Sequence, residues 1–342
     1  MKIIVDAMGG DNAPACNVKG ALDAVKAYGV EVVLVGREEE LRACLAREGV
    51  KQLPEGIELV HAEQVVEMND DPATAFKKKK DSSLTVGLNL LKEGKGDAFV
   101  SAGSTGALLS AATLLVKRVK GIRRAAMAPV IPTGGGPAIL IDCGANAECT
   151  PEYLLQFAYM GSFYAEHALN KPSPRVGLLN IGVEETKGTD LQRQTYELLT
   201  QANEAGRIHF IGNVEARDAV FGAADVIVAD GYSGNIFLKT LEGTGMFLAG
   251  EIKKMFKKSA LTKLAALLVS GGIRDFKKLL DSREVGGTAL LGISKPVIKA
   301  HGSSDAYAIQ NAIRQAAGVA GSGMVETIVE HIEEMKLEQG EV

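Results

Sequence analysis

Short apolar runs rich in β-branched residues recur along the chain, and stretches with apolar residues at three-to-four spacing lie between many of them. The short runs predict buried strands, and the spaced stretches predict amphipathic helices. The predicted strands are Ile3–Val5, Val32–Val35, Ala98–Val100, Ile139–Ile141, Val176–Leu179, Ile208–Ile211, Val226–Val228 and a late run at Val297–Ala300. The predicted helices are Asn17–Tyr28, Leu84–Leu91, Ala107–Val119, Pro151–Leu169 and Leu191–Ala205.

Alternation of strands with helices is typical of an α/β protein whose helices cover both faces of a parallel sheet. We therefore expect one three-layer α/β/α domain with a largely parallel sheet over residues 1–342. The composition agrees, because hydrophobic residues make up 46% of the chain while aromatic residues make up only 5% and Trp is absent. Such an interior consists mainly of Ala, Val, Ile and Leu, which suits helices packed on a buried sheet.

Glycines and polar residues follow seven of the predicted strands, at the point where each strand ends. In a parallel sheet these carboxyl ends share one edge, where ligands bind. We expect a polar, glycine-lined cleft along that edge. Its candidate residues are Asp6, Gly9, Gly10, Asp11, Asn12, Ser101, Gly103, Ser104, Thr105, Gly106, Asp142, Asn146, Asn180, Lys187, Asn213, Asp230, Asn235, Lys239, His301, Ser303 and Ser304.

Glycine loops that lead into helices suit an anion, because they present unpaired N–H groups. The loop Ser101–Gly106 fits this role, and Lys187 and Lys239 could point to the same edge. Capping of the next helix by Ser104 or Thr105 is an equally good explanation, and both can hold together. The chain contains neither GxGxxG nor GxxxxGK[ST], which weighs against dinucleotide and P-loop sites.

Of the five histidines, only His301 lies in a strand-end loop, so it is a candidate acid or hydrogen-bond donor. A bond within its own turn is the alternative. Four strand-end carboxylates, Asp6, Asp11, Asp142 and Asp230, could bind a divalent metal. We favour a structural role for them, and we expect neither a metal nor a cofactor.

The net charge of −4 gives no indication of nucleic-acid binding. The four cysteines form no CxxC pair, so we expect reduced thiols, partly in the core. We find no signal peptide and no apolar stretch of about 18 residues, and therefore expect a cytoplasmic protein without a membrane span.

Residues 252–280 carry eight basic side chains against a single acid, Asp275. An apolar stripe runs through the same segment at Leu261, Leu264, Leu267 and Leu268. Gly271-Gly272 predicts a break, which would make residues 245–285 an inserted helical hairpin. A basic amphipathic segment is typical of a peripheral contact with an anionic membrane, here through the leucines with Lys257 and Lys258. A dimer interface with a solvated lysine face is the alternative.

Seven motifs occur in order: VDAMGGD, SAGSTGAL, DCGAN, the Asn180–Lys187 loop, FIGNVEARD, DGYSGN and KAHGSSD. Together they resemble the bacterial phosphate acyltransferases that use fatty acyl-carrier protein (acyl-ACP), over nearly the whole chain. The resemblance implies a fold like phosphotransacetylases and isopropylmalate dehydrogenases, and a homodimer. It also implies conversion of acyl-ACP and inorganic phosphate into acyl phosphate and ACP. That product would feed a membrane glycerol-3-phosphate acyltransferase in phospholipid synthesis. Ser104 replaces the Asn of the common family loop SAGNTG, which keeps a hydroxyl but loses the amide.

This chemistry needs no Ser or Cys nucleophile, since phosphate is itself nucleophilic and a thiolate with a pKa of about 8.5 leaves readily. We assign phosphate to the Ser101–Gly106 loop with Lys187, and oxyanion donation to Asn235 or His301. In the first loop, the acids would shape the backbone, the glycines would admit substrate, and Asn12 would donate a hydrogen bond. The run Lys77–Lys80 is either a docking patch for acidic ACP or a solvated helix end.

Two other functions compete with this interpretation. An isopropylmalate-type NAD-dependent dehydrogenase would need residues dedicated to nicotinamide, and none is evident. A non-catalytic scaffold that recruits ACP to a membrane would need no polar cleft at the strand ends.

Overall fold

The computed structural model describes residues 1–336, except for the side chains of Leu279, Leu280 and Ser282. Residues 337–342 of the expected domain lie outside this range. The strands are β1 (Lys2–Asp6), β2 (Glu31–Gly36), β3 (Ile57–His61), β4 (Ala98–Ser101), β5 (Ala126–Ala128), β6 (Val130–Thr133), β7 (Gly136–Ile141), β8 (Arg175–Asn180), β9 (His209–Glu215), β10 (Val226–Val228), β11 (Gly287–Leu291) and β12 (Val297–Ala300).

The helices lie between these strands or follow them. They are α1 (Ala15–Tyr28), α2 (Glu38–Arg47), α3 (Ala75–Lys78), α4 (Ser83–Lys92), α5 (Thr105–Ala111), α6 (Pro151–Leu169), α7 (Asp190–Glu204), α8 (Ala216–Val220), α9 (Gly231–Lys257), α10 (Ala260–Leu268), α11 (Ser270–Leu280), α12 (Ala306–Gly321) and α13 (Met324–Glu330). A π-helical turn, η1 (Ala112–Val116), continues α5, and a 3₁₀ turn, η2 (Ser282–Glu284), follows α11.

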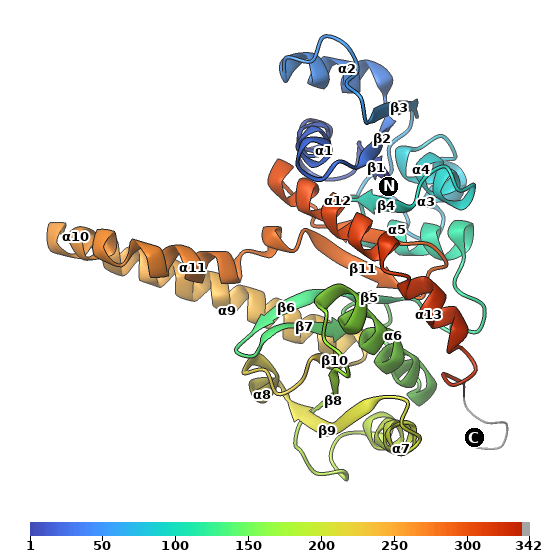
Figure 1. The fold of residues 1–342 in the computed structure, drawn as a ribbon, viewed down its shortest axis with the longest axis vertical. Helices are drawn as coiled ribbons and strands as arrows, with labels where there is room; N and C mark the ends of the chain where they lie inside the picture. The colour runs from blue at the N-terminus through green and yellow to red at the C-terminus, as the bar shows by residue number, and fades with distance from the viewer. Residues whose placement is uncertain (337–342) are drawn as a thin grey trace.

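The strands form two sheets, so the expected single sheet is divided (Figure 1). The seven-stranded sheet has the order β3-β2-β1-β4-β12-β11-β5, and the five-stranded sheet has the order β6-β7-β10-β8-β9. Among the named strands of the described residues, β11 pairs antiparallel with β12 and β5, β6 pairs antiparallel with β7, and the other pairs are parallel. The predicted α/β class with largely parallel sheets is confirmed.

The division lies at Pro129, the single residue between β5 and β6. β5 pairs with β11 in the larger sheet, and β6 pairs with β7 in the smaller one. Proline has no N–H to donate to a ladder, so a strand changes partner there at little cost. The two sheets therefore share one bent stretch of chain.

Each sheet is covered by helices on both faces, as a three-layer arrangement requires. In β1, Ile3 and Val5 pack into the core beneath α1 and α12, whereas Ile4 packs into the core beneath α4 and α5. In the smaller sheet, α6 and α7 cover one face, and α8 with the start of α9 covers the other. One cluster of buried side chains includes residues from both sheets.

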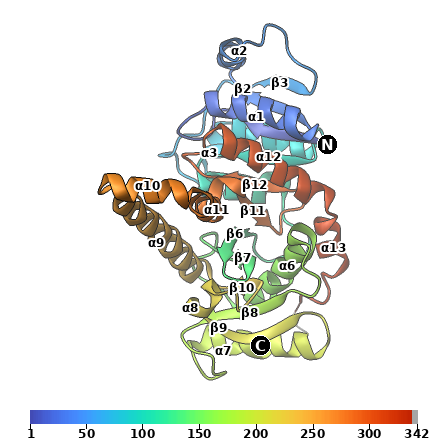
Figure 2. The same cartoon turned by 60° about the vertical axis from the view of Figure 1, so that its left-hand side comes forward.

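Helices α9, α10 and α11 form an arm that projects from the body in both views (Figures 1 and 2). α9 has 27 residues, which corresponds to about 40 Å at about 1.5 Å per residue. The predicted break at Gly271-Gly272 is wrong, because both glycines lie inside α11. The chain reverses just after α9 instead, where Ser259 and Thr262 form a capping box that starts α10.

Within residues 1–336, no helix combines the length and apolar character that a membrane crossing requires.

Candidate functional site

The predicted site residues fall on two edges, one for each sheet. The first edge comprises residues 6–12, 101–106 and 299–305 at the ends of β1, β4 and β12. The second edge comprises residues 142–149, 180–188, 213–215 and 230–239 at the ends of β7, β8, β9 and β10. The expectation of one shared edge is therefore wrong, because the strands belong to two sheets. No hydrogen bond or ion pair of the described chain joins the two edges directly.

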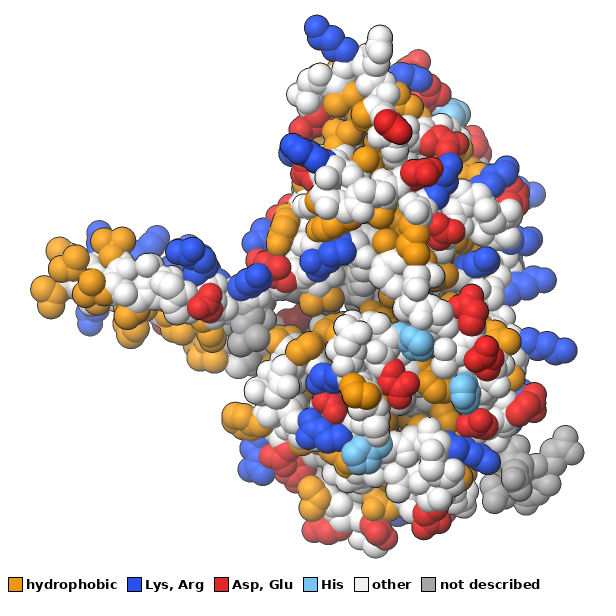
Figure 3. Space-filling view, viewed as in Figure 1, with side chains coloured by type: hydrophobic (Ala, Val, Ile, Leu, Met, Phe, Trp, Pro, Cys, Tyr) orange, Lys and Arg blue, Asp and Glu red, His pale blue; other side chains and the backbone are white. Residues whose placement is uncertain are grey.

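Both edges lie at the base of the arm. α9 leaves from the second edge, where Asp230 caps its first turn. The returning chain reaches the first edge, where the Arg283 guanidinium donates to the Asp305 carboxylate over 2.8 Å. The surface is hollowed beside this base, between the two halves of the body (Figure 3). One edge thus leads into the arm and the other receives the chain that returns from it.

The first edge carries a row of three polar side chains on adjacent strands. The Ser101 hydroxyl donates to the Asp6 carboxylate over 2.7 Å. Lys299 is paired in register with Ser101, so their side chains lie on the same face. Burial raises the pKa of the Asp6 carboxyl, and hydrogen bonds from serine hydroxyls oppose this rise. Burial lowers the pKa of Lys299 to about 8, opposed by the negative charges of Asp6 and Asp11.

The glycines of the first loop allow close contact between loops. A Cβ at Gly9 would lie 2.6 Å from the Asp6 carboxylate and 2.8 Å from the Gly103 nitrogen. Gly10 has a φ of +104°, and a Cβ there would lie 2.9 Å from that of Ala102. These distances are too short for any side chain, so the two glycines are required for packing of the loops. Access for a substrate stays a prediction.

Backbone and amide groups tie the first loop to the last one. The Asp11 N–H donates to the Gly302 carbonyl over 2.8 Å. The Asn12 amide donates to the carbonyls of Ser303 and Ser304, each over 3.2 Å. In this structure the Asn12 amide N–H groups therefore bond to the neighbouring loop.

Two residues of the first edge were not predicted from the sequence. Buried Asn17 donates to the carbonyls of Asp6, Ala7 and Gly9, and so fixes the first loop from within α1. Lys299 is the other, and its signal was available: a lysine inside the otherwise apolar run Val297–Ala300.

The Ser101–Gly106 loop leads directly into α5. The Ser104 hydroxyl caps α5 by accepting from the Ala107 N–H over 3.5 Å, and half-buried Thr105 is the first helical residue. Gly106 packs against Pro72, from which a Cβ would be 2.9 Å away. The capping explanation thus describes what Ser104 does here, and a phosphate role is an additional proposal.

His301 is exposed and bonds within its own turn, where its Nδ1 lies 2.8 Å from the Ser303 hydroxyl. This is the local alternative to a catalytic role, although Nε2 is not engaged in that contact. The buried Ser304 hydroxyl has no partner among the described residues.

The second edge is organised around the fully buried Asp142. Its carboxylate accepts from the backbone N–H groups of Met127 at 2.8 Å, Asn146 at 2.7 Å and Ala145 at 3.3 Å. It also accepts from the Asn146 side chain at 3.0 Å. Burial raises the pKa of the Asp142 carboxyl, and these hydrogen bonds oppose the rise. Asp142 therefore acts as the internal anchor of its loop.

Two asparagines hold the loop that carries Lys187. The Asn180 side chain donates to the Lys187 carbonyl over 3.2 Å, and the Asn213 side chain donates to the Glu184 carbonyl over 2.9 Å. The Lys187 side chain itself is exposed and forms no ion pair within residues 1–336. The loop thus presents a free ammonium from a fixed backbone.

The first turns of α9 supply the other predicted residues of this edge. Asp230 accepts from the N–H and the hydroxyl of Ser233, each over 2.8 Å. Asn235 is exposed, and its carboxamide lies close to Gly144, where a Cβ would be 3.7 Å away. Lys239 pairs with Glu242 over 2.9 Å, so its charge is already partnered.

Neither edge offers a metal cage or a thiolate. Within residues 1–336, no three His, Cys, Asp or Glu side chains are grouped so that they could hold an ion. All four cysteines are free, as predicted, and Cys44 and Cys143 are buried. Burial raises the pKa of Cys143 and of Cys149 to about 12, so neither thiol is a ready nucleophile at neutral pH.

Side chains at the tip of the arm are apolar and open to solvent (Figure 3). The exposed fractions of Leu261 and Leu268 are 81% and 82%, and Leu264, Leu267, Lys257 and Lys258 are exposed as well. In the Lys77–Lys80 run, Lys79 pairs with Asp70 over 2.5 Å, whereas the other three lysines are exposed.

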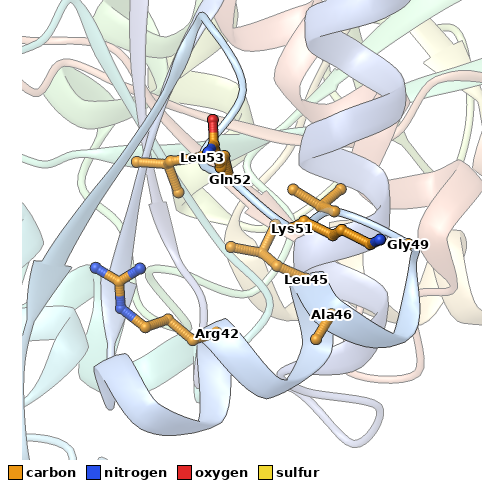
Figure 4. A pocket seen from close by; sticks show the side chains of 8 residues that line it. Arg42, Leu45, Ala46, Gly49, Lys51, Gln52 and Leu53 are labelled. Atoms are coloured by element: carbon orange, nitrogen blue, oxygen red, sulfur yellow. The ribbon is translucent and has the colours of Figure 1, made fainter.

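A shallow depression between α2 and the chain that follows it is lined by apolar residues and two cations (Figure 4). Arg42, Leu45, Lys51 and Leu53 are among the lining residues. It includes no residue of either edge, and we assign it no role.

Comparison with known proteins gives consistent results. A family model described as fatty acid synthesis protein matches residues 1–327. A phosphate acyltransferase from Thermoanaerobacterium thermosaccharolyticum is 45% identical, over 97% of both chains. The same enzyme from Desulfitobacterium hafniense is 47% identical, over 96% of both chains.

Among solved structures, a phosphotransacetylase from Streptococcus pyogenes superposes with a TM-score of 0.65 at 18% identity, over 94% of both chains. A branched-chain phosphotransacylase from Enterococcus faecalis gives a TM-score of 0.58 at 15% identity, over 94% of this chain and 99% of that one. The expected likeness to the phosphotransacetylase fold is confirmed.

Proposed function

The chain belongs to the fatty acid synthesis protein family and is an acyltransferase, and from that premise we propose that it converts fatty acyl-ACP and inorganic phosphate into acyl phosphate and free ACP. The observation that carries this proposal is the 45% identity, over 97% of the chain, to a protein named phosphate acyltransferase. The acyl phosphate would serve a membrane glycerol-3-phosphate acyltransferase in phospholipid synthesis.

In the proposed reaction a phosphate oxygen attacks the thioester carbonyl without a covalent enzyme intermediate. A C–O bond forms, the C–S bond breaks, and the thiolate of ACP leaves and takes up a proton. The protein must hold phosphate near the carbonyl and stabilise the oxyanion that develops. The first edge would bind phosphate at the Ser101–Gly106 loop, and Lys187 would approach it from the second edge.

The candidates for oxyanion donor differ in availability. Asn235 is exposed at the start of α9, beside Gly144. His301 already uses Nδ1 within its own turn, so only Nε2 is left for substrate. We therefore favour Asn235 as the donor, with His301 at the opposite edge as a contact to phosphate. Lys239 is the weakest candidate because Glu242 partners it.

The first test is product formation from palmitoyl-ACP and inorganic phosphate by the purified protein, without metal, nucleotide or membrane. We expect acyl phosphate to appear in step with free ACP. Absence of turnover while ACP and liposomes still bind would favour the scaffold function instead. Nicotinamide-dependent turnover would favour a dehydrogenase.

We further propose that the arm places the protein peripherally on an anionic membrane. Exposed leucines at the tip beside lysines support this, since apolar burial and attraction to anionic lipid act together. Replacing Leu267 and Leu268 by Glu should abolish sedimentation with phosphatidylglycerol vesicles, whereas Leu53→Glu, a change of another exposed leucine, should not. If the arm serves a homodimer instead, the double variant would lose the dimer in sedimentation velocity and keep vesicle binding.

A further inference from the structure

Lys299 differs from the other lysines of the described chain in being buried, with an exposed fraction of 7%. It lies on β12, in a strand whose other residues are apolar. A buried ammonium costs free energy unless it is well partnered. An apolar side chain would therefore be the default at this position, and the charge calls for an explanation.

The surroundings of the ammonium do not supply an ion pair. Nζ donates to the Ala300 carbonyl and, over 3.4 Å, to the Ala102 carbonyl. No carboxylate lies within salt-bridge distance of it in the described chain, although Asp6 and Asp11 act on its charge from further away. A simple role as half of a stabilising ion pair is thus not what the geometry offers.

Lys299 instead contacts the loop that opens the first edge. Ala102 and Gly103 share one peptide unit, and this unit is held at both ends. Its carbonyl accepts from the Lys299 ammonium, and its N–H donates to the Ser101 hydroxyl over 3.1 Å. Ser101 in turn donates to Asp6. Three strands thereby fix the orientation of one peptide at the start of the Ser101–Gly106 loop.

We propose that Lys299 is a positioning residue for phosphate: it holds the Ala102–Gly103 peptide so that the Ser101–Gly106 loop keeps its anion-binding form, and it places a positive charge beneath that loop. This inference rests on the proposed function, which assigns phosphate to the loop. Hydrogen bonds from a charged donor are stronger than neutral ones, and the ammonium acts together with the Ser101 hydroxyl on this peptide.

The test compares Lys299→Met with Lys299→Arg and with a matched control, Lys171→Met. Lys171 is also partly buried and charged, but it pairs with Asp225 over 2.6 Å and belongs to neither edge. We expect Lys299→Met to raise the phosphate KM about tenfold or more, with a change of less than about threefold in the acyl-ACP KM. Lys299→Arg should recover part of the loss. Lys171→Met should lower the melting temperature and leave the phosphate KM unchanged.

A folded Lys299→Met variant with the wild-type phosphate KM would overturn the inference. If that variant does not fold, Ser101→Ala, which releases the other end of the same peptide, takes its place. A wild-type phosphate KM in Ser101→Ala would then overturn it equally. An equal loss for both substrates would indicate a general structural role and also overturn it. Failure of the proposed function is distinguishable, because the wild-type protein would then show no phosphate-dependent turnover.

Discussion

The two edges are built on the same plan and stabilised in different ways. Each has a buried aspartate just where a strand ends, Asp6 in the larger sheet and Asp142 in the smaller one. Asp6 bonds to Ser101, 95 positions away in the sequence, and Asn12 reaches a carbonyl 291 positions away. The Asp142 carboxylate bonds mostly to its own loop, and the most distant partner of that carboxylate is Met127, 15 positions away. The first edge is therefore a junction of distant segments, whereas the Asp142 carboxylate of the second edge mainly holds its own loop.

The two edges also differ in how far their polar side chains are exposed. The lysine of the first edge, Lys299, is buried beneath its loops, whereas Lys187 and Asn235 of the second edge are exposed. A reaction between phosphate and a large thioester needs a fixed anion site and groups that can reach the carbonyl. This contrast suggests that the first edge supplies the fixed site and the second edge supplies the reaching groups.

The largest expected effect is on kcat, and it tests this division of roles between the two edges. Lys187→Ala should lower kcat about 100- to 1,000-fold, the usual range for removal of one electrostatic donor in a transition state. The melting temperature should not change, because Lys187 is exposed and lacks an ion pair in the described chain. Acyl phosphate formation and a thermal melt measure the two quantities. Lys51→Ala, which removes an exposed lysine away from both edges, is the control. Wild-type kcat and phosphate KM in Lys187→Ala would show that Lys187 has no role in the reaction.

The next effect is on stability at the second edge. Asp142→Ala leaves the partly buried N–H donors of Met127 and Asn146 without this acceptor, and we expect a loss of about 3 kcal/mol in the free energy of unfolding. Asp97→Ala removes an exposed carboxylate that accepts one backbone N–H, and it should cost about 1 kcal/mol or less. Urea denaturation of both variants measures the two losses in the free energy of unfolding. Equal losses would mean that Asp142 is not the internal anchor of its loop.

The sequence allowed the regular elements to be predicted where hydrophobic periodicity was strong. Pro151–Leu169, Val226–Val228 and Val297–Ala300 are found at the predicted residues. Four strands, β3, β5, β6 and β11, were missed. Of the two at the division between the sheets, β5 is three residues long and β6 contains a proline. Without them, the chain gave no sign that its strands divide between two sheets.

The candidate site shows the same limit. Strand-end positions were predictable, since glycine and polar residues mark them locally. Their partners were not, because the contacts of Asp6 and Asn12 join segments that only the tertiary fold brings together. Lys299 was overlooked although its signal, a lysine inside the otherwise apolar run Val297–Ala300, was present.

A smaller effect tests the junction character of the first edge. Gly10→Ala should cost about 2 kcal/mol, because it combines an unfavourable φ with a clash against Ala102. Gly94 also has a positive φ, of +73°, but a Cβ at that position would meet no other atom within 4 Å, so Gly94→Ala should cost about 1 kcal/mol. Urea denaturation of both variants gives the difference, which isolates the contact between loops. If the two variants lose the same free energy of unfolding, the first loop moves freely away from the loop that carries Ala102, and the first edge is not a junction.

The smallest effect concerns how closed the second edge is at rest. Cys143 lies in the Asp142 loop, and burial raises its pKa to about 12. At pH 8 the thiolate fraction is then about one in ten thousand, and because the thiolate is the reactive form, alkylation by iodoacetamide should be very slow. Reactivity should rise about tenfold per pH unit, since the pKa lies far above the working range. Mass spectrometry of peptides containing Cys143, with and without urea, measures this. Rapid labelling at pH 8 without urea would mean that the Asp142 loop opens in the folded protein, and that Asp142 does not hold it closed.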